Sequence, residues 1–181
     1  MITGTAKGVR LKSPPPSVTR ATSDLTRGAV FSALESMGFE WDEVLDLYAG
    51  SGALGIEALS RGAEKAYFVD RNRAACNVIR QNLAATGFTE RGVVVQSTVE
   101  SALSTLAREF GVIFMDPPYM EVDLDELMNR VVESKAAESS KVLVLEHSKR
   151  EEPAQRYGRF VSTRRQQHGE TNVSFYVGVA R

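Results

Sequence analysis

The chain has 181 residues, 43% of them hydrophobic and 25% charged, values that fit one soluble globular domain with a full core. Its apolar runs are too short to cross a bilayer and its N-terminus lacks the apolar core of a signal peptide, so we expect a cytoplasmic protein. The single cysteine, Cys76, excludes an internal disulfide, and no Cys/His cluster suggests a metal site.

The net charge of -1 hides an uneven distribution of charge along the chain. Residues 1–30 and residues 149–181 each carry a net charge of +4, which leaves -9 for the stretch between them. Basic ends around an acidic centre are typical of a protein whose ends contact a polyanion. Charge alone nevertheless favours the simpler interpretation, which is chance clustering on solvated faces.

The first 23 residues are predicted to form a basic arm. A short glycine-containing start, interpreted as a hairpin, precedes "KSPPPS" (12–17), whose three prolines favour a stiff and extended segment. Apolar residues at helical spacing then predict a helix over about 24–37.

From residue 44 onward, buried strands alternate with helices. Strands are predicted at 44–48, 65–70, 92–96, 111–116 and 141–147, with a helix in each interval. Two further strands, joined by a turn at "HGET" (168–171), follow without a helix between them. The pattern predicts a doubly wound, Rossmann-like α/β fold: a mostly parallel seven-stranded sheet with a C-terminal antiparallel hairpin and a small N-terminal extension. We expect one domain over residues 1–181, with its catalytic core at 24–181.

The loop "DLYAGSGALG" (46–55) joins the first of these strands to the helix after it. Gly50, Gly52 and Gly55 satisfy the G-x-G-x-x-G spacing, and Asp70 ends the next strand about 20 residues later. This is the spacing of a dinucleotide-binding loop, so an NAD-dependent oxidoreductase is the obvious alternative.

Asp46 argues against a dinucleotide, because a pyrophosphate would bring negative charge close to this carboxylate in a cleft of low dielectric constant. The ammonium and sulfonium of S-adenosylmethionine (SAM) would be attracted instead, and its carboxylate could meet amides near the helix N-terminus. Asp70 would then accept hydrogen bonds from the ribose hydroxyls. In the purely structural alternative, Asp46 caps a turn and Asp70 begins a helix. The residues expected to bind the cofactor here are Asp46, Tyr48, Ala49, Gly50, Ser51, Gly52, Asp70 and Arg71.

The stretch "FMDPPYM" (114–120) ends the fourth predicted strand, which should flank the first strand where the winding of the sheet reverses. An exocyclic amino group of a base is a poor nucleophile, because its lone pair is delocalised into the ring. Asp116 and the Pro117 carbonyl could accept its two hydrogens, while Pro118 stiffens the turn and Tyr119 offers a face for an extruded base. These four residues are the predicted catalytic residues. A buried strand followed by a proline-rich turn is the simpler alternative.

The stretches 44–63, 69–72 ("VDRN") and 114–119 resemble the RsmD family of bacterial 16S ribosomal RNA guanine-N2 methyltransferases. With looser matches in the N-terminal and C-terminal parts, the resemblance covers nearly the whole chain. The resemblance implies a SAM-dependent methyltransferase fold, SAM as methyl donor without a metal, and a guanine of small-subunit ribosomal RNA as acceptor. The partner would be 16S ribosomal RNA within an assembled or assembling small subunit. This chain has "STVE" where related methylases carry an acid or amide, so backbone amides around Thr98 and Val99 are expected to hold the adenine.

The basic ends are then expected to contact the RNA backbone, through Lys7, Arg10, Arg20, Arg27, Arg164 and Arg165. The chain departs from the family's N-terminal pattern at Ala21, Leu25 and Gly28, which replace a proline, a basic residue and a glutamate. No obligate protein partner and no membrane are implied.

Several other functions stay open from the sequence. The same chemistry fits adenine-N6 methylation of DNA or RNA, and methylation of a glutamine amide in a protein. An NAD oxidoreductase would need a hydride-transfer acid or base, such as a Tyr–Lys or His–Asp arrangement, which is not evident. A noncatalytic RNA-binding module would not need the complete "DPPY" (116–119).

Overall fold

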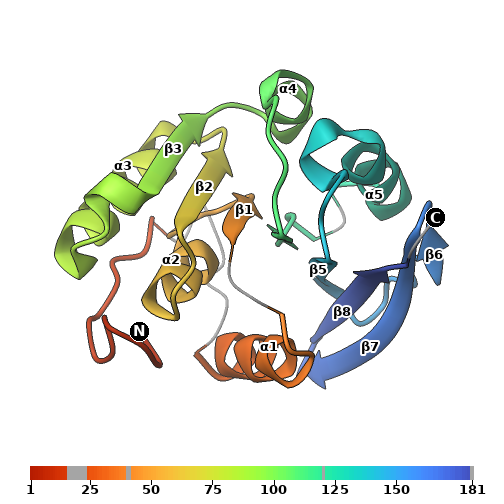
Figure 1. The fold of residues 1–181 in the computed structure, drawn as a ribbon, viewed down its shortest axis with the longest axis horizontal. Helices are drawn as coiled ribbons and strands as arrows, with labels where there is room; N and C mark the ends of the chain where they lie inside the picture. Colours follow the sequence, from red (N-terminus) through yellow and green to blue (C-terminus); the bar gives the residue numbers. More distant parts are fainter. Residues whose placement is uncertain (16–23, 40–41, 120, 180–181) are drawn as a thin grey trace.

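The computed structural model describes residues 1–15, 24–39, 42–119 and 121–179, which fold around one central sheet (Figure 1). Its strands are β1 (Glu43–Leu47), β2 (Lys65–Asp70), β3 (Gly92–Gln96), β4 (Val112–Met115), β5 (Val142–Ser148), β6 (Arg156–Tyr157), β7 (Phe160–His168) and β8 (Thr171–Gly178). The strand order is β3-β2-β1-β4-β5-β8-β7-β6. Strands β1 to β5 pair in parallel, and β8, β7 and β6 continue the sheet in antiparallel pairs.

Helices cover both faces of the sheet (Figure 1). On one face lie α1 (Asp24–Ser36), α2 (Ala53–Ser60) and α3 (Arg73–Thr86), and on the other lie α4 (Val99–Thr105) and α5 (Leu124–Glu133). Two short 3-10 helices are η1 (Thr89–Arg91) and η2 (Lys135–Ala137). Each face has its own hydrophobic cluster, so the sheet is buried on both sides and its parallel strands are almost continuously apolar.

The helix boundaries follow from short sequence signals. The Asn72 side chain accepts hydrogen bonds from the backbone N–H groups of Ala74 and Ala75 and so caps the start of α3. This helix ends at Gly87, which adopts a left-handed φ of 76°. The predicted end of the helix at Gly87 is therefore confirmed.

The predicted alternation of strands and helices and the C-terminal hairpin are confirmed, with one addition to the sheet. Seven strands were expected, and the described residues form eight. The extra strand, β6, has only two residues and pairs with the start of β7. A segment this short carries no period-two pattern, so the sequence offered no signal for it.

The N-terminal segment is not a hairpin. Residues 1–15 form turns without a strand, closed by hydrogen bonds from the Met1 ammonium to the Val9 carbonyl and from the Gly8 N–H to the Met1 carbonyl. Nor is this segment a free arm, because it is hydrogen-bonded to two helices. The part of the arm at 16–23 lies outside the described residues, so the boundary at residue 23 and the single-domain division stay predictions.

Glu57 of α2 is the main anchor of this segment. It is 0% exposed, and its carboxylate accepts the Ile2 N–H at 2.9 Å and the Thr3 N–H at 3.0 Å. Further along, Lys12 and Asn82 of α3 exchange hydrogen bonds, from the Lys12 N–H at 2.8 Å and to the Lys12 carbonyl at 2.9 Å. The segment is thus fixed against α2 and α3. No helix in the part of the chain that the structure describes is long and apolar enough to cross a membrane.

The packing of α2 on β2 generates a first prediction. A Cβ at Gly55 would lie 2.4 Å from a ring carbon of Phe68, so Gly55→Ala is expected to lower the free energy of unfolding by about 1–3 kcal/mol. Gly28→Ala in α1 is the control, because its Cβ would lie 3.6 Å from Ile2 Cδ1 and the helix gains up to about 1 kcal/mol. Urea unfolding of both variants measures the difference, and equal effects would contradict this account of the α2–β2 contact.

Candidate functional site

Four acidic side chains gather at one edge of the sheet. Asp46, Asp70 and Glu146 lie near the carboxyl ends of β1, β2 and β5, and Asp116 follows β4 directly. The apolar residue two positions before each acid belongs to the cluster beneath α1, α2 and α3. Because side chains alternate along a strand, all four acids lie on that same face. This is the edge where doubly wound sheets bind ligands.

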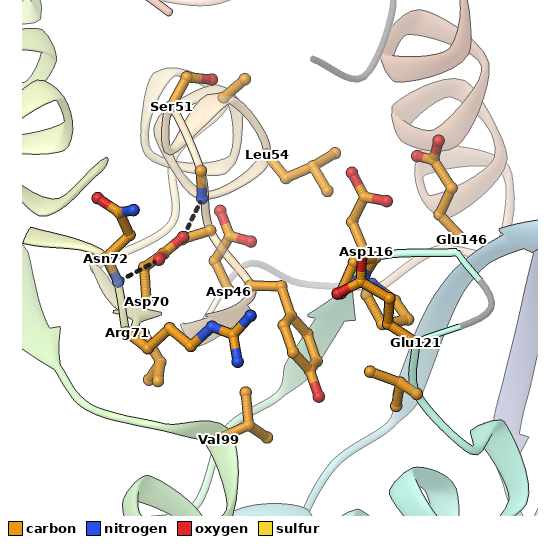
Figure 2. A pocket seen from close by; sticks show the side chains of 18 of the residues that line it. Asp46, Ser51, Leu54, Asp70, Arg71, Asn72, Val99, Asp116, Glu121 and Glu146 are labelled. Carbon is orange, nitrogen blue, oxygen red and sulfur yellow. Dashed lines mark hydrogen bonds between the residues drawn. The ribbon is translucent and has the colours of Figure 1, made fainter. Parts of the chain in front are cut away.

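The four acids line a cavity of about 850 Å³. Figure 2 shows Asp70, Arg71 and Asn72 on one side of it, Asp116 and Glu146 on the other, and Asp46 between them. Among the described residues, the lining has one arginine against six carboxylic side chains, namely Asp46, Asp70, Glu100, Asp116, Glu121 and Glu146. The cavity therefore favours a ligand that carries positive charge or many N–H donors, and disfavours a phosphate.

The loop between β1 and α2 is held in place by Asp70. Its carboxylate accepts the Gly50 N–H at 2.9 Å through one oxygen and the Asn72 N–H at 2.8 Å through the other (Figure 2). The loop itself needs left-handed backbone at Tyr48, Gly50 and Gly52, with φ of 58°, 55° and 76°. Glycine adopts this conformation at little cost, whereas Tyr48 is strained, which is common at functional sites.

Asp46 is the most deeply buried of the four acids, with 2% of its surface exposed. Its carboxylate accepts the Gly55 N–H in the first turn of α2 at 2.9 Å. Burial raises the pKa of Asp46 from 3.8 to about 8; the Gly55 hydrogen bond opposes this rise and the nearby Asp70 charge adds to it. At neutral pH Asp46 therefore holds a proton until a positive ligand favours its ionised form.

The turn after β4 presents a polar and an aromatic group to the cavity. The Asp116 N–H lies 3.5 Å from the Leu47 carbonyl, which keeps this turn against the end of β1. The hydroxyl of Tyr119 lies 2.5 Å from Thr171 Oγ1 and donates to Glu146 Oε1 at 3.3 Å. Burial raises the pKa of Tyr119 to about 12, so its hydroxyl stays protonated. The ring is thus fixed by contacts with β5 and β8.

The structure brings almost all of the predicted catalytic and cofactor-binding residues to one cavity. Its lining includes Asp46, Tyr48, Ala49, Gly50, Ser51, Asp70, Arg71, Thr98, Val99, Asp116, Pro117, Pro118 and Tyr119. Gly52 is not part of the lining and instead precedes α2 as its N-cap residue. The roles of these residues stay predictions, whereas their convergence is a structural finding.

Other lining residues were missed by the sequence reasoning. They are Pro14, Thr26, Ala53, Leu54, Val69, Asn72, Ser97, Glu100, Glu121, Val122, Glu146, His168 and Thr171. Glu146 had a usable signal in the sequence. It is an acid near the end of a buried strand, and this is the feature that identified Asp46, Asp70 and Asp116. Thr26 and Thr171 had none, because α1 and β8 reach the cavity only through the tertiary fold.

The predicted RNA-binding residues separate into three groups. Lys7, Arg10 and Arg164 are exposed, and Arg165 is partly buried and pairs with Glu152 at 2.7 Å. Arg20 lies outside the described residues. Arg27 differs from the others because it is buried.

Arg27 lies inside the fold, with 6% of its surface exposed. Its guanidinium pairs with Asp24 at 2.8 Å and approaches Glu57 to 3.8 Å, so it links α1 to α2. Its position on the inner face of an amphipathic helix explains the difference. Arg27 therefore stabilises the packing of α1 and does not offer a surface contact to phosphates.

Known proteins and one protein family match this chain over most or all of its length. Residues 1–177 match the family described as "Conserved hypothetical protein 95". "Putative rRNA methyltransferase YlbH" of Bacillus subtilis is 37% identical over 179 residues, which cover 97% of each chain. "Ribosomal RNA small subunit methyltransferase D" of Escherichia coli is 35% identical over 129 residues, 71% of this chain and 64% of that protein. The solved structure of "Putative methyltransferase yhhF from Escherichia coli" matches with a TM-score of 0.84 and 28% identity. The match covers 100% of this chain and 98% of that chain.

The raised pKa of Asp46 predicts how stability depends on pH. Between pH 4 and pH 8 the folded protein holds a proton on Asp46 that the unfolded chain releases, so this group makes stability fall as pH rises. Asp46→Asn removes this titration, and the variant should gain stability relative to the parent by up to about 1.4 kcal/mol per pH unit across that window. Urea unfolding of the ligand-free proteins from pH 5 to pH 9 measures the difference. Parallel curves for the two proteins would show that Asp46 is ionised in the folded state.

Proposed function

The chain belongs to the RsmD family of methyltransferases, and from this premise we propose that it transfers a methyl group from SAM to the exocyclic N2 amino group of a guanine in 16S ribosomal RNA. The observation that carries the proposal is the single cavity into which the loop after β1, the end of β2 and the turn after β4 all converge. Methyl transfer requires the loop after β1, which would bind the cofactor, and the turn after β4, which would align the amino group, to meet at one site.

The residues at the β1 and β2 ends of the cavity fit SAM. The buried Asp46 carboxylate is matched by a ligand with an ammonium and a sulfonium, and the cavity's many acids oppose a pyrophosphate. Asp70 already accepts two backbone N–H groups, yet a carboxylate can accept about four hydrogen bonds, so it can still bind ribose hydroxyls. Thr98 and Val99 line the same cavity at the end of β3, where the adenine would lie.

The turn after β4 would align the base. When bound, SAM supplies a methyl group on a sulfonium sulfur, which keeps the electron pair of the broken S–C bond. Asp116 and the Pro117 carbonyl would accept the two N2 hydrogens, so that the nitrogen lone pair points at the methyl carbon. The proton that N2 loses on forming the new N–C bond would pass to Asp116 or to solvent. This catalysis consists mainly of alignment and hydrogen bonding.

The choice of RNA rests on the relatives. Methyltransferase D of Escherichia coli is named for the small-subunit ribosomal RNA, and YlbH of Bacillus subtilis for ribosomal RNA. We extend this substrate to the present chain, with an assembled or assembling small subunit as the partner and the cytoplasm as the compartment. Labelled SAM offered together with ribosomal RNA, DNA and protein tests the extension, and mass mapping of 16S ribosomal RNA locates the methyl group. Label that appears only in DNA or protein would overturn it.

Asp116 provides a direct test of the proposed chemistry. Asp116→Ala should reduce methyl transfer by roughly a hundredfold or more, because an aligning group of the transition state is lost. The affinity for SAM, measured by calorimetry, should change little. Asp116→Asn is the matched variant and should keep part of the activity, since its carbonyl still accepts a hydrogen bond. Equal losses of SAM affinity and turnover would make Asp116 a structural residue.

The exposed basic residues of the N-terminal segment provide a test of RNA docking. Lys7→Ala combined with Arg10→Ala should weaken RNA binding and flatten the slope of log affinity against log salt by about 1 to 2. The matched control is Arg108→Ala combined with Lys141→Ala. This control also removes two positive charges, but near the amino ends of β4 and β5, at the edge of the sheet opposite the cavity. Equal slopes for the two double variants would exclude the N-terminal segment from the RNA interface.

A further inference from the structure

We propose that Glu146 selects the base, by accepting the ring N1–H of the guanine whose N2 amino group is methylated. This inference rests on the proposed function and extends it to a residue outside both recognised motifs.

The sheet places Glu146 beside Asp116. Strands β4 and β5 are parallel neighbours whose last paired residues are Met115 and Leu145, so Asp116 and Glu146 occupy the next positions along each strand. Both lie on the face covered by α1, and both line the cavity. Figure 2 shows their side chains next to each other on one side of the pocket, away from Asp70 and Arg71. A flat group bound to Asp116 through one edge could therefore present its neighbouring atoms to Glu146.

The chemistry of the base edge matches two neighbouring acceptors. Guanine carries its N2 amino group and its N1–H side by side, so one edge presents adjacent donors. Adenine presents its N6 amino group beside a ring N1 that is an acceptor. A carboxylate next to Asp116 would hydrogen-bond the first arrangement and repel the lone pair of the second. Enzymes that act on extruded bases read this edge in the same manner.

Burial gives the contact its selectivity. Glu146 is 9% exposed, so a base that offers no hydrogen would leave the carboxylate facing a lone pair with little access to water. Sites built to hydrogen-bond a donor reject analogues that lack it far more strongly than apolar pockets reject a change of shape. The Tyr119 hydroxyl donates to Glu146 Oε1 at a long 3.3 Å, so the carboxylate lies beside the ring on which the base would stack, while its position is determined by β5.

The test varies the base and the side chain together. The target guanosine is located by mass mapping, and 16S ribosomal RNA is assembled by splinted ligation with guanosine, 2,6-diaminopurine riboside or 2-aminopurine riboside at that position. Both analogues keep an N2 amino group and lack the N1–H, and they differ from each other at the 6-position. Both also lack the 6-carbonyl of guanosine, which a carboxylate cannot bind, so the part of the shared discrimination that Glu146→Gln removes reports the N1–H. The RNAs are presented alone and in reconstituted small subunits.

The parent protein should methylate the guanosine RNA at least about a hundredfold more efficiently than either analogue. For Glu146→Gln, methylation of guanosine should slow and the preference should shrink to less than about tenfold. Tyr119→Phe is the control, because it removes the hydroxyl contact and leaves Glu146 in place; its preference for guanosine should match that of the parent.

Each other outcome overturns the inference. Equal methylation of the three RNAs by the parent protein shows that the site does not recognise the N1–H. This result requires the parent protein alone. An undiminished preference in Glu146→Gln removes Glu146 from base selection and leaves the proposed function intact. A preference that also collapses in Tyr119→Phe makes Glu146 a support for Tyr119 only. If the parent methylates none of these RNAs but labels another acceptor, the proposed function itself fails.

Discussion

Burying carboxylates at one edge of a parallel sheet is the constraint on which this site depends. A buried carboxylate loses hydration, and the loss must be offset by hydrogen bonds or by a positive ligand. Asp70 is satisfied within the fold by two backbone N–H groups. Asp46 accepts the Gly55 N–H at the start of α2, and burial still outweighs this bond and raises its pKa. Asp46 therefore holds a proton in the folded protein, and a cationic ligand at this position would replace that proton.

The same hydrogen bonds determine the shape of the loop between β1 and α2. Asp46 fixes the first turn of α2, and Asp70 fixes Gly50, so the loop between them is held at both ends. The close packing of Gly55 on Phe68 brings α2 near enough to β1 for the Asp46 contact to form. Electrostatics and packing thus depend on one another here. A larger residue at position 55 would move the helix away from the carboxylate as well as strain the core.

The fold and most of the site could be predicted from the sequence because they rest on local signals. Alternating apolar runs identified the parallel strands, and an acid at a strand end identified three of the four acids that share a face. Contacts between residues far apart in the chain left no such signal. Glu57 is the clearest case, since its burial beneath Ile2 and Thr3 depends on how the N-terminal segment returns to α2. Arg27 was misassigned to the surface for the same reason, because its partner Glu57 lies 30 residues away.

The acidic cavity and the basic chain ends would act on different parts of a nucleic acid, the first on its bases and the second on its phosphates. The acidic lining of the described cavity repels phosphates, so a backbone would be held outside by residues such as Lys7 and Arg10. Only an uncharged base can then enter, which requires it to leave its stack. Within the described lining, six carboxylic side chains face one arginine, and this favours the base edge with the most N–H groups. Guanine, with N1–H beside its N2 amino group, meets that condition better than adenine does. If the proposed function holds, the charge pattern would favour base extrusion and base choice by the same physical means.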